Sequence, residues 1–529
     1  MAEAIVYDGG VMKNRRQFLA GAVSATAALA QQPRNPSRPN ILHIMSDQQQ
    51  WETIAGRSEC RTPNIDRLAK SGMLFERSYT PSAVCCPARA ILLSGAYHWH
   101  NGVYNQIHSS PSVHRDMFPD VVLYSQRLRD AGYRLGYVGK WHSSWLRGPF
   151  EFGFQEVADL TSYRGAAKDN ERSNVKVQRS KDQLRRVVKR TMQWPGSEPF
   201  PMWGYADGPE EATPEYYRTD CAIRVMQRLA AGNGPWHLEV HYIQPHDPYF
   251  PLKKYYDRYD PRSIPVPDNF RDDFKGKPGL HRRESETWGK VSEDDVRASR
   301  AAYYAQAEQL DAQIGRLLDA LDKTGQAENT MVVFTTDHGD MVGGHRMWIK
   351  GWIPYEECYR VPMIVRWPGR IRPGSRTRRL VQTHDLAHTY VTAAGAAAMP
   401  YADGRDLHPL FADPEGPGWA DEILCAYYGG EFLYTQRMAI TSRFKYVFNG
   451  FDFDELYDLE NDPGEIRNQV DNPQYRTDAD QMRERIYALM TRFGDPYGGG
   501  AQPPGGVGER PNRYGAPRYL FLSRQNTTR

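Results

Sequence analysis

Ionisable residues follow several short apolar runs in this 529-residue chain. Asp47 comes shortly after the run ILHIM, and Asp337 and His338 come shortly after MVVF. Two further runs, LGYV and LEVHYI, lead into Lys140 and His246. Carboxylates and imidazoles can ligate a cation, while lysines and histidines can stabilise charge or move a proton. These residue types indicate chemistry on an anionic substrate if the runs converge.

A second unusual feature is the stretch VCCPAR, which places Cys85 directly before Cys86. Adjacent cysteines can hardly bridge each other without strained disulfide geometry. The chain holds six cysteines, too few for a disulfide framework in a protein of this length. Taken alone, Cys85 would be interpreted as a small buried apolar residue.

The elements that must position these residues are strands and helices in alternation. Each apolar run has the length and composition of a buried strand. A helix is predicted before the run MVVF, because Ser292 and Asp295 have capping-box spacing and Gly325 provides a stop. Its apolar face carries Leu310, Ile314, Leu317, Leu318 and Leu321. This order predicts an α/β sheet, in which ligands bind beyond the carboxyl ends of the strands.

Bulk composition and the N-terminus restrict the class of protein. The net charge of +3 and the 40% of hydrophobic residues favour a globular protein and give no sign of a nucleic-acid partner. Residues 1–30 resemble a twin-arginine signal peptide, with Arg15 and Arg16 before a weakly apolar run. That run is too short to span a bilayer. We therefore expect export by the twin-arginine machinery to the periplasm or exterior, without stable membrane insertion, over an ordinary N-terminal helix.

The remaining chain divides into regions by composition. We expect a main domain over residues 38–420 with an insertion at about 163–215, a C-terminal subdomain over 421–495 and a Gly/Pro-rich tail over 496–529. The insertion holds a basic stretch that we predict to be helical. A solvated helix face is favoured there over a patch that attracts an anionic polymer. Its cations are Arg179, Lys181, Arg185, Arg186, Lys189 and Arg190.

The order of the motifs resembles the formylglycine-dependent sulfatase family of the alkaline-phosphatase-like superfamily. Residues 85–89 match the family signature C-x-P-x-R, and the matching motifs extend over roughly residues 38–470. The resemblance implies an α/β fold with a large mixed, mostly parallel sheet flanked by helices, and a smaller C-terminal α+β subdomain. The other motifs are SDQ at 46–48, TPNIDRL at 62–68, GKWH at 139–142, PH at 245–246, DHG at 337–339, His345 with Lys350, YEE at 355–357, RVP at 360–362 and ELYDL at 455–459 with Asp462-Pro463.

The resemblance also implies how Cys85 would act. In the family, a formylglycine-generating enzyme oxidises the first cysteine of the signature to 3-oxoalanine, an aldehyde that hydrates to a diol. One diol oxygen attacks sulfur, and the second hydroxyl then expels sulfate, which splits one displacement into two easier steps. Arg89 would hold the diol, while Cys86 occupies the variable position.

Metal and substrate residues carry over in the same way. Asp47, Gln48, Asp337, His338 and the modified Cys85 match the metal positions, and oxygen ligands suit Ca²⁺. The family usually has an aspartate where this chain has Gln48, and an imidazole ligand leaves Mg²⁺ or Mn²⁺ open. Asp47 alone could equally be a turn or capping residue.

The residues that would surround the sulfate are four basic side chains and one amide. Lys140 and Lys350 would supply positive charge, and His142 would orient the diol. His246 or Lys350 would protonate the leaving alkoxide, and Asp337 would activate the nucleophile. Asn105 is a further candidate contact, although the neighbouring stretch YHWHN departs from the family pattern. Each lysine or histidine taken alone is more typical of a surface or core residue.

Three functions fit these motifs to different degrees. The first is an exported sulfatase that hydrolyses sulfate monoesters of glycans or of small alkyl or aryl alcohols. The second is a phosphonate monoester or phosphodiester hydrolase of the same superfamily, which the pair Lys140 and His142 disfavours because those relatives use neutral hydroxyl residues there. The third is a non-catalytic protein that binds sulfated glycans through its basic insertion. The complete catalytic set favours the first.

Overall fold

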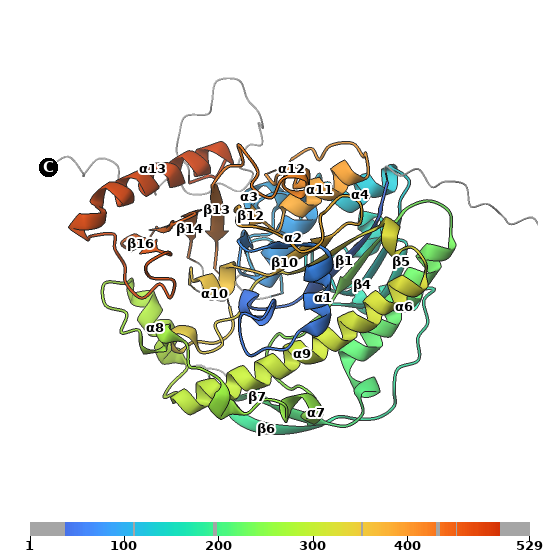
Figure 1. Cartoon of the computed structure of the whole chain (residues 1–529), viewed down its shortest axis with the longest axis horizontal. Coiled ribbons are helices and arrows are strands. Elements are labelled where there is room, and N and C mark those ends of the chain that lie inside the picture. Colours follow the sequence, from blue (N-terminus) through green and yellow to red (C-terminus); the bar gives the residue numbers. More distant parts are fainter. Residues whose placement is uncertain are drawn as a thin grey trace, which may run out of the picture. The chain divides into compact units, whose positions relative to one another are not determined.

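A computed structural model describes residues 38–497 apart from 109–111, 194–197, 351–352, 402, 430–433 and 451. Its main sheet has eight strands in the order β11-β2-β10-β9-β1-β8-β4-β5 (Figure 1). Only β10 pairs antiparallel to its neighbours, β2 and β9. The predicted mixed, mostly parallel sheet is therefore confirmed. The strands are β1 (Asn40–Ser46), β2 (Met73–Phe75), β4 (Arg134–Lys140), β5 (Glu156–Thr161), β8 (Trp236–His241), β9 (Thr330–Thr336), β10 (Met363–Arg366) and β11 (Ser375–Thr377).

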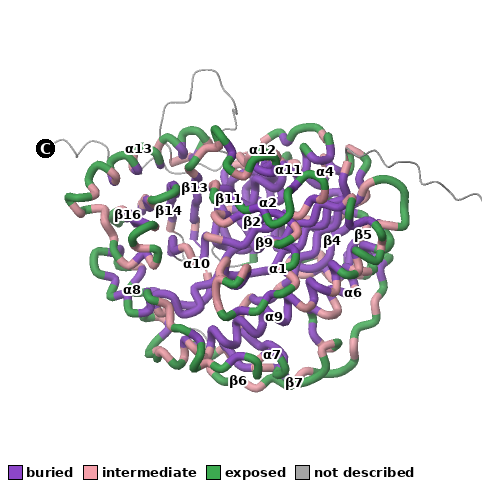
Figure 2. Tube along the Cα trace, in the orientation of Figure 1, coloured by how far each residue is buried: buried purple, intermediate pink, exposed green. Residues whose placement is uncertain are grey.

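Helices cover both faces of this sheet, which explains why its central strands are buried along their whole length. On β1, Leu42 and Ile44 join one core cluster while Ile41 and Met45 join another. Figure 2 shows these central strands buried throughout. The first cluster includes residues of α1 (Pro63–Ser71), α6 (Pro214–Ala231) and α9 (Glu293–Lys323), and the second includes residues of α2 (Cys85–Ser94), α4 (Tyr124–Asp130) and α11 (Asp385–Ala393).

The long helix α9 begins as the sequence predicts. Ser292 accepts a hydrogen bond from the Asp295 backbone N–H, and the Asp295 carboxylate accepts one from the Ser292 backbone N–H, which completes the capping box. Leu310 and Ile314 are fully buried in the core. Gly325 follows the helix with φ of 69°, a conformation that favours glycine.

A smaller antiparallel sheet forms the C-terminal part. Its strands run in the order β13-β14-β15-β16, and α13 (Arg476–Arg492) packs on it. The expected α+β character of this region is confirmed. The strands are β13 (Glu422–Tyr427), β14 (Gln436–Thr441), β15 (Phe444–Asn449) and β16 (Glu455–Asp458).

The basic insertion differs from its predicted structure. Strand β6 (Arg185–Met192) pairs antiparallel with β7 (Phe200–Asp207), so the predicted helix at this stretch is wrong. Val187 and Val188 are β-branched, and tertiary pairing with β7 outweighs the weak helical preference of the flanking cations. Backbone bonds from Gly204 N to Tyr249 O, at 3.0 Å, and from Tyr249 N to Met202 O, at 2.8 Å, join the hairpin to the loop after β8.

The shorter described elements connect these layers. They are β3 (Ser78–Tyr79), α3 (His98–Asn101), α5 (Ala166–Arg172), α7 (Lys253–Tyr256), α8 (Gly279–Thr287), α10 (Glu356–Tyr359), β12 (Val381–Gln382) and α12 (His408–Ala412). Among residues 38–497 with the gaps named above, no helix is long and apolar enough to cross a membrane. The predicted signal peptide and nearly all of the predicted tail lie outside the described residues.

Candidate active site

Adjacent strands bring the predicted site residues to one edge of the main sheet. Asp47 follows β1, Asp337 and His338 follow β9, Lys140 ends β4, and His246 lies in the loop after β8. Because β9, β1, β8 and β4 are neighbours and run parallel, their carboxyl ends meet at this edge. The sheet order therefore places side chains that lie up to about 300 residues apart in the chain around one point.

Cys85 begins helix α2 and is buried beside this edge. Its Sγ, which stands in for the hydroxyl oxygens of a hydrated formylglycine, lies 3.1 Å from His338 Nε2 and 3.9 Å from Asp47 Oδ1. Burial alone would raise the pKa of the thiol, but the charges of Lys140 and Lys350 hold it well below its usual range. The position thus stabilises a negatively charged nucleophile.

Arg89 lies one turn further along α2 and joins the two carboxylates. Its guanidinium donates to Asp47 Oδ2 and Asp337 Oδ2, each at 2.8 Å, and to the Lys140 carbonyl at 3.0 Å. Arg89 is fully buried, so these charge-assisted bonds have little competition from water. Arg89 thus orients the two carboxylates, while its bonds to a diol at position 85 stay a prediction.

Lys140 ends β4, and His142 follows it two residues later. Lys140 Nζ is 2.5 Å from Asp47 Oδ2, and the residue is almost completely buried. His142 has a φ of 51°, and its Nε2 shares a 2.9 Å hydrogen bond with His108 Nδ1. Burial and the charge of Lys140 lower the pKa of His142 to about 3, so its imidazole is neutral near pH 7.

His246 and Lys350 form a second polar group at the site. Lys350 Nζ lies 2.6 Å from both His246 Nε2 and Gln48 Oε1. Burial lowers the pKa of His246, but the carboxylates of Asp247 and Asp47 outweigh it and raise the pKa overall. An ammonium has no acceptor, so the short contact requires Lys350 to donate to a His246 Nε2 without a proton. Lys350 therefore donates one of its protons to this ring nitrogen.

Gln48, which departs from the family pattern, has partners that the sequence did not reveal. Its Nε2 donates to Asp247 Oδ1 at 2.9 Å and to Asp340 Oδ2 at 2.5 Å. Each N–H of the amide thus meets one carboxylate, and the amide oxygen accepts from Lys350. Asp247 directly follows His246, and Asp340 lies two residues after His338. This proximity to predicted site residues could have suggested both aspartates.

The sequence also did not predict a layer of buried polar residues that contacts Arg89. Arg89 Nη1 lies 3.2 Å from His241 Nδ1, and His241 Nε2 lies 2.6 Å from Glu239 Oε2. Glu239 Oε1 also contacts His237 Nε2 at 2.8 Å and the hydroxyl of Tyr124. Burial raises the pKa of Glu239 well above its usual range. His237, Glu239 and His241 alternate along β8. Their period-two spacing in the run WHLEVH was the sequence pattern that could have indicated this buried polar layer.

The donor set around Cys85 fits a hard divalent cation. Asp47, Cys85, Asp337 and His338 are all buried, and one ligand atom from each lies within 4.8 Å of the others. Two carboxylates with one imidazole suit Ca²⁺, Mg²⁺ or Mn²⁺. The Gln48 oxygen, by contrast, is directed to Lys350. Asn105 is buried, and the side chain of its neighbour Gln106 places Oε1 2.8 Å from Cys86 Sγ.

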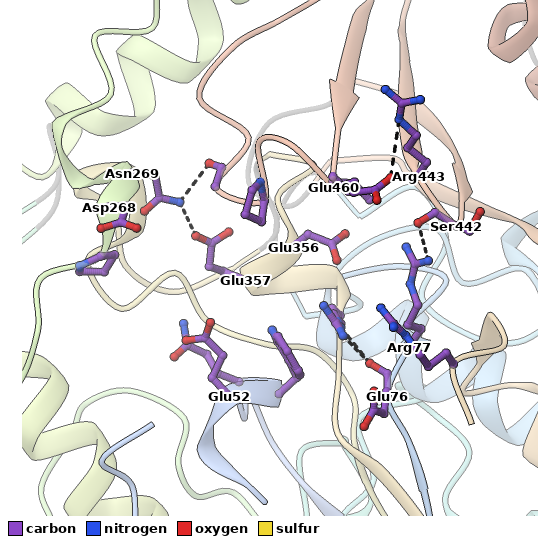
Figure 3. Close-up of a pocket in the computed structure, with 18 of the residues that line it drawn as sticks. Glu52, Glu76, Arg77, Asp268, Asn269, Glu356, Glu357, Ser442, Arg443 and Glu460 are labelled. Atoms are coloured by element: carbon purple, nitrogen blue, oxygen red, sulfur yellow. Dashed lines mark hydrogen bonds and ion pairs between the residues drawn. The ribbon is translucent and has the colours of Figure 1, made fainter. Parts of the chain in front are cut away.

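A separate cavity of about 940 Å³ lies between the main sheet and the C-terminal sheet. Figure 3 shows its charged lining, including Asn269 donating to Glu357 and Arg443 beside Glu460. None of the predicted catalytic residues lines this cavity. The chemistry is therefore assigned to the cluster around Cys85, where buried opposite charges converge.

The fold and this cluster define a hydrolase of the alkaline-phosphatase-like class. The family model described as Sulfatase matches residues 39–396, and the model of the C-terminal region of N-sulphoglucosamine sulphohydrolase matches residues 343–492. The chain belongs to the sulfatase family, a family of sulfuric ester hydrolases.

Individual relatives agree with this assignment. The chain is 29% identical over 481 residues to the uncharacterized sulfatase YidJ of Escherichia coli, covering 87% of this chain and 88% of the relative. It is also 29% identical to a choline-sulfatase of Rhizobium meliloti, with coverages of 87% and 86%. The structure of BT4656 in complex with D-glucosamine-2-N,6-O-disulfate superposes with a TM-score of 0.67, at 21% identity and coverages of 87% and 99%.

The phosphonate monoester hydrolase SpPMH of Silicibacter pomeroyi has the same fold. It superposes with a TM-score of 0.71 at 23% identity, and the match covers 86% of this chain and 96% of that one. Similarity at this level establishes the shared fold and leaves the choice between ester classes to the site residues.

Proposed function

We propose that the protein is an exported sulfatase that hydrolyses sulfate monoesters with a formylglycine derived from Cys85 and a divalent metal. The observation that carries this proposal is the position of Cys85, whose buried side chain lies against His338 and Asp47 within a shell of fixed charges. Preorganised charges of this kind commonly supply the largest catalytic contribution.

The cation would be held by Asp47, Asp337 and His338, with Gln48 as the remaining family position. When bound, it would neutralise charge on the sulfate oxygens. Arg89 keeps both carboxylates oriented toward this point. Ca²⁺ is the first choice for these ligands, and Mg²⁺ or Mn²⁺ would also accept the imidazole.

The nucleophile would be a hydroxyl of the hydrated aldehyde at position 85. Asp337 would take its proton, and His142 would orient the diol through a neutral ring nitrogen. Lys140 and Lys350 would stabilise the charge that develops on sulfate oxygens. Attack on sulfur breaks the bond from sulfur to the ester oxygen, and the second hydroxyl then expels sulfate by C–O cleavage.

Protonation of the leaving alkoxide would come from the pair formed by His246 and Lys350. Lys350 donates to His246 Nε2 across a 2.6 Å contact, so it could protonate the alkoxide itself or pass a proton to His246, which would then protonate the alkoxide. This arrangement explains why either residue could be assigned as the general acid from the sequence.

The substrate class supported best is a sulfated glycan fragment or a small alkyl or aryl sulfate. The relatives include a choline-sulfatase and an N-acetylglucosamine-6-O-sulfatase of Bacteroides thetaiotaomicron, whose names span both classes. The twin-arginine signal predicted for residues 1–30 would place the enzyme where such compounds are encountered outside the cytoplasm.

The proposal is tested by combining mass spectrometry with a substrate panel. The protein is produced with the formylglycine-generating enzyme, and the peptide containing Cys85 is expected to carry the aldehyde. Sulfate monoesters are expected to be hydrolysed much faster than phosphonate monoesters or phosphodiesters, and Cys85→Ala is expected to abolish turnover. The reverse ranking would favour a phosphonate monoester hydrolase, and activity in Cys85→Ala would refute the nucleophile. Binding of sulfated glycan without turnover would favour a non-catalytic protein.

A further inference from the structure

Cys86, the variable residue of the signature, lies in a cluster that the proposed mechanism leaves unexplained. Cys86 is in the first turn of α2, His108 lies in the loop after α3, and His142 lies in the loop after β4. The thiol and one nitrogen from each imidazole lie within 4.8 Å of one another. Three segments that are distant in the chain thus bring one sulfur and two nitrogen donors together.

The geometry of this cluster is close to that of a metal site. Ligand bonds of about 2.0–2.3 Å place donors about 3.3–3.7 Å apart around a tetrahedral ion. His108 Nδ1 and His142 Nε2 are now 2.9 Å apart, so a modest opening of this hydrogen bond would admit an ion. Cys86 Sγ contacts Gln106 Oε1 at 2.8 Å, which fixes the thiol near the histidines.

The access to the cluster also suits metal binding. Cys86 and His142 are buried, whereas His108 is exposed and gives an ion a route from solvent. The 2.9 Å hydrogen bond between His142 Nε2 and His108 Nδ1 needs one donor and one acceptor, so one of these two nitrogens already presents a lone pair. His142 Nδ1 is buried and has no hydrogen-bond partner among the described residues.

The donor types differ from those of the neighbouring carboxylate site. One sulfur and two imidazole nitrogens select borderline or soft ions such as Zn²⁺, whereas the oxygens of Asp47 and Asp337 select hard ions. We propose that Cys86, His108 and His142 form a second metal site that binds Zn²⁺ and thereby inhibits the enzyme. This inference rests on the proposed function, because it assigns regulation to the same catalytic centre.

Inhibition follows from the double use of His142. A Zn²⁺ ion would form a bond with the His142 nitrogen, another with the His108 nitrogen and a third with the Cys86 sulfur, while the thiol proton leaves to solvent. The fourth position would remain for water. The captured imidazole can no longer orient the diol at position 85, so turnover falls while the carboxylate site keeps its own cation.

The test uses the full-length, formylglycine-containing enzyme saturated with Ca²⁺. ZnCl₂ is titrated while hydrolysis of an aryl sulfate is followed, and Co²⁺ binding is followed separately by thiolate-to-cobalt charge-transfer absorption. The wild-type enzyme is expected to be inhibited and to show the absorption band. Cys86→Ser and His108→Ala are expected to keep basal activity but to require at least about tenfold more Zn²⁺ for inhibition, because even outer-shell losses cost about 10–100-fold in metal affinity.

Control variants distinguish this cluster from metal binding elsewhere on the protein. Cys221→Ser removes a buried thiol in α6 and is expected to leave both the Zn²⁺ response and the Co²⁺ band unchanged. Mass spectrometry confirms the aldehyde in every variant, and activity without Zn²⁺ tests the proposed function independently. The inference is overturned if Cys86→Ser is inhibited like the wild type, or if the band persists in it, since Zn²⁺ would then act at another position, such as the carboxylates.

Discussion

Lys140→Met tests whether fixed positive charge at the sheet edge drives hydrolysis. Lys140 is 5% exposed, and its Nζ contacts Asp47 at 2.5 Å, so methionine removes the charge while keeping much of the side-chain volume. Two unit charges about 4 Å apart interact by about 4 kcal/mol at an effective dielectric constant of about 20. Loss of one preorganised group in comparable sites lowers kcat by about 10²–10³. We therefore expect kcat/KM to fall by about 10²–10³.

The assay is steady-state hydrolysis of an aryl sulfate, with aldehyde content measured for each preparation. The variant is expected to fold, because Asp47 retains Arg89 as a partner at 2.8 Å. Circular dichroism and urea unfolding check this expectation. Lys253→Met is the matched control, since Lys253 is exposed in α7 and is expected to change kcat/KM less than about twofold. A fully modified Lys140→Met enzyme within about tenfold of wild type would refute the assigned role of this charge.

Three further outcomes are expected. Cys85→Ser should attack sulfate esters but stall as a covalent sulfate ester, because serine lacks the second hydroxyl, and mass spectrometry of the intact protein would detect the adduct or its absence. Chelation of the metal should abolish activity and lower the Tm, since Asp47 and Asp337 then repel each other, and added Ca²⁺ should restore both. Lys445→Met should reduce the free energy of unfolding by about 3–5 kcal/mol in urea titrations, because fully buried Lys445 lies 2.8 Å from both Glu356 and Glu465. An unchanged urea midpoint would contradict this.

The free energy of unfolding is expected to depend on pH through Glu465, which lies beside Lys445. Burial raises the pKa of Glu465 to about 8 in the folded protein, despite the nearby charge of Lys445. A carboxyl whose folded pKa is raised contributes stability below its unfolded pKa and loses that contribution as pH rises toward 8. Glu465→Gln should therefore lose less stability than wild type between pH 5 and 9, as measured by urea unfolding. Parallel pH profiles for the two proteins would contradict the assignment.

The local patterns in the sequence predicted the main sheet well. Four apolar runs became β1, β4, β8 and β9, and the capping box at Ser292 began α9 as expected. Burial on both faces of a parallel sheet imposes continuous apolar composition, so such strands are visible in the sequence. The basic stretch at 185–190 lacks such a constraint, and its pairing with β7 depended on a partner that local propensity does not specify.

The sequence by itself determined which residues could act, because the C-x-P-x-R signature and its accompanying motifs specify side-chain chemistry and order. The tertiary structure alone decided what surrounds them. Gln48 meets Asp247 and Asp340, and His142 meets His108, through contacts that span from 34 to 292 residues. Hydrogen bonds, shared protons and metal-ligand sets depend on distances of a few ångströms between side chains. Only the packing of strands and loops sets those distances.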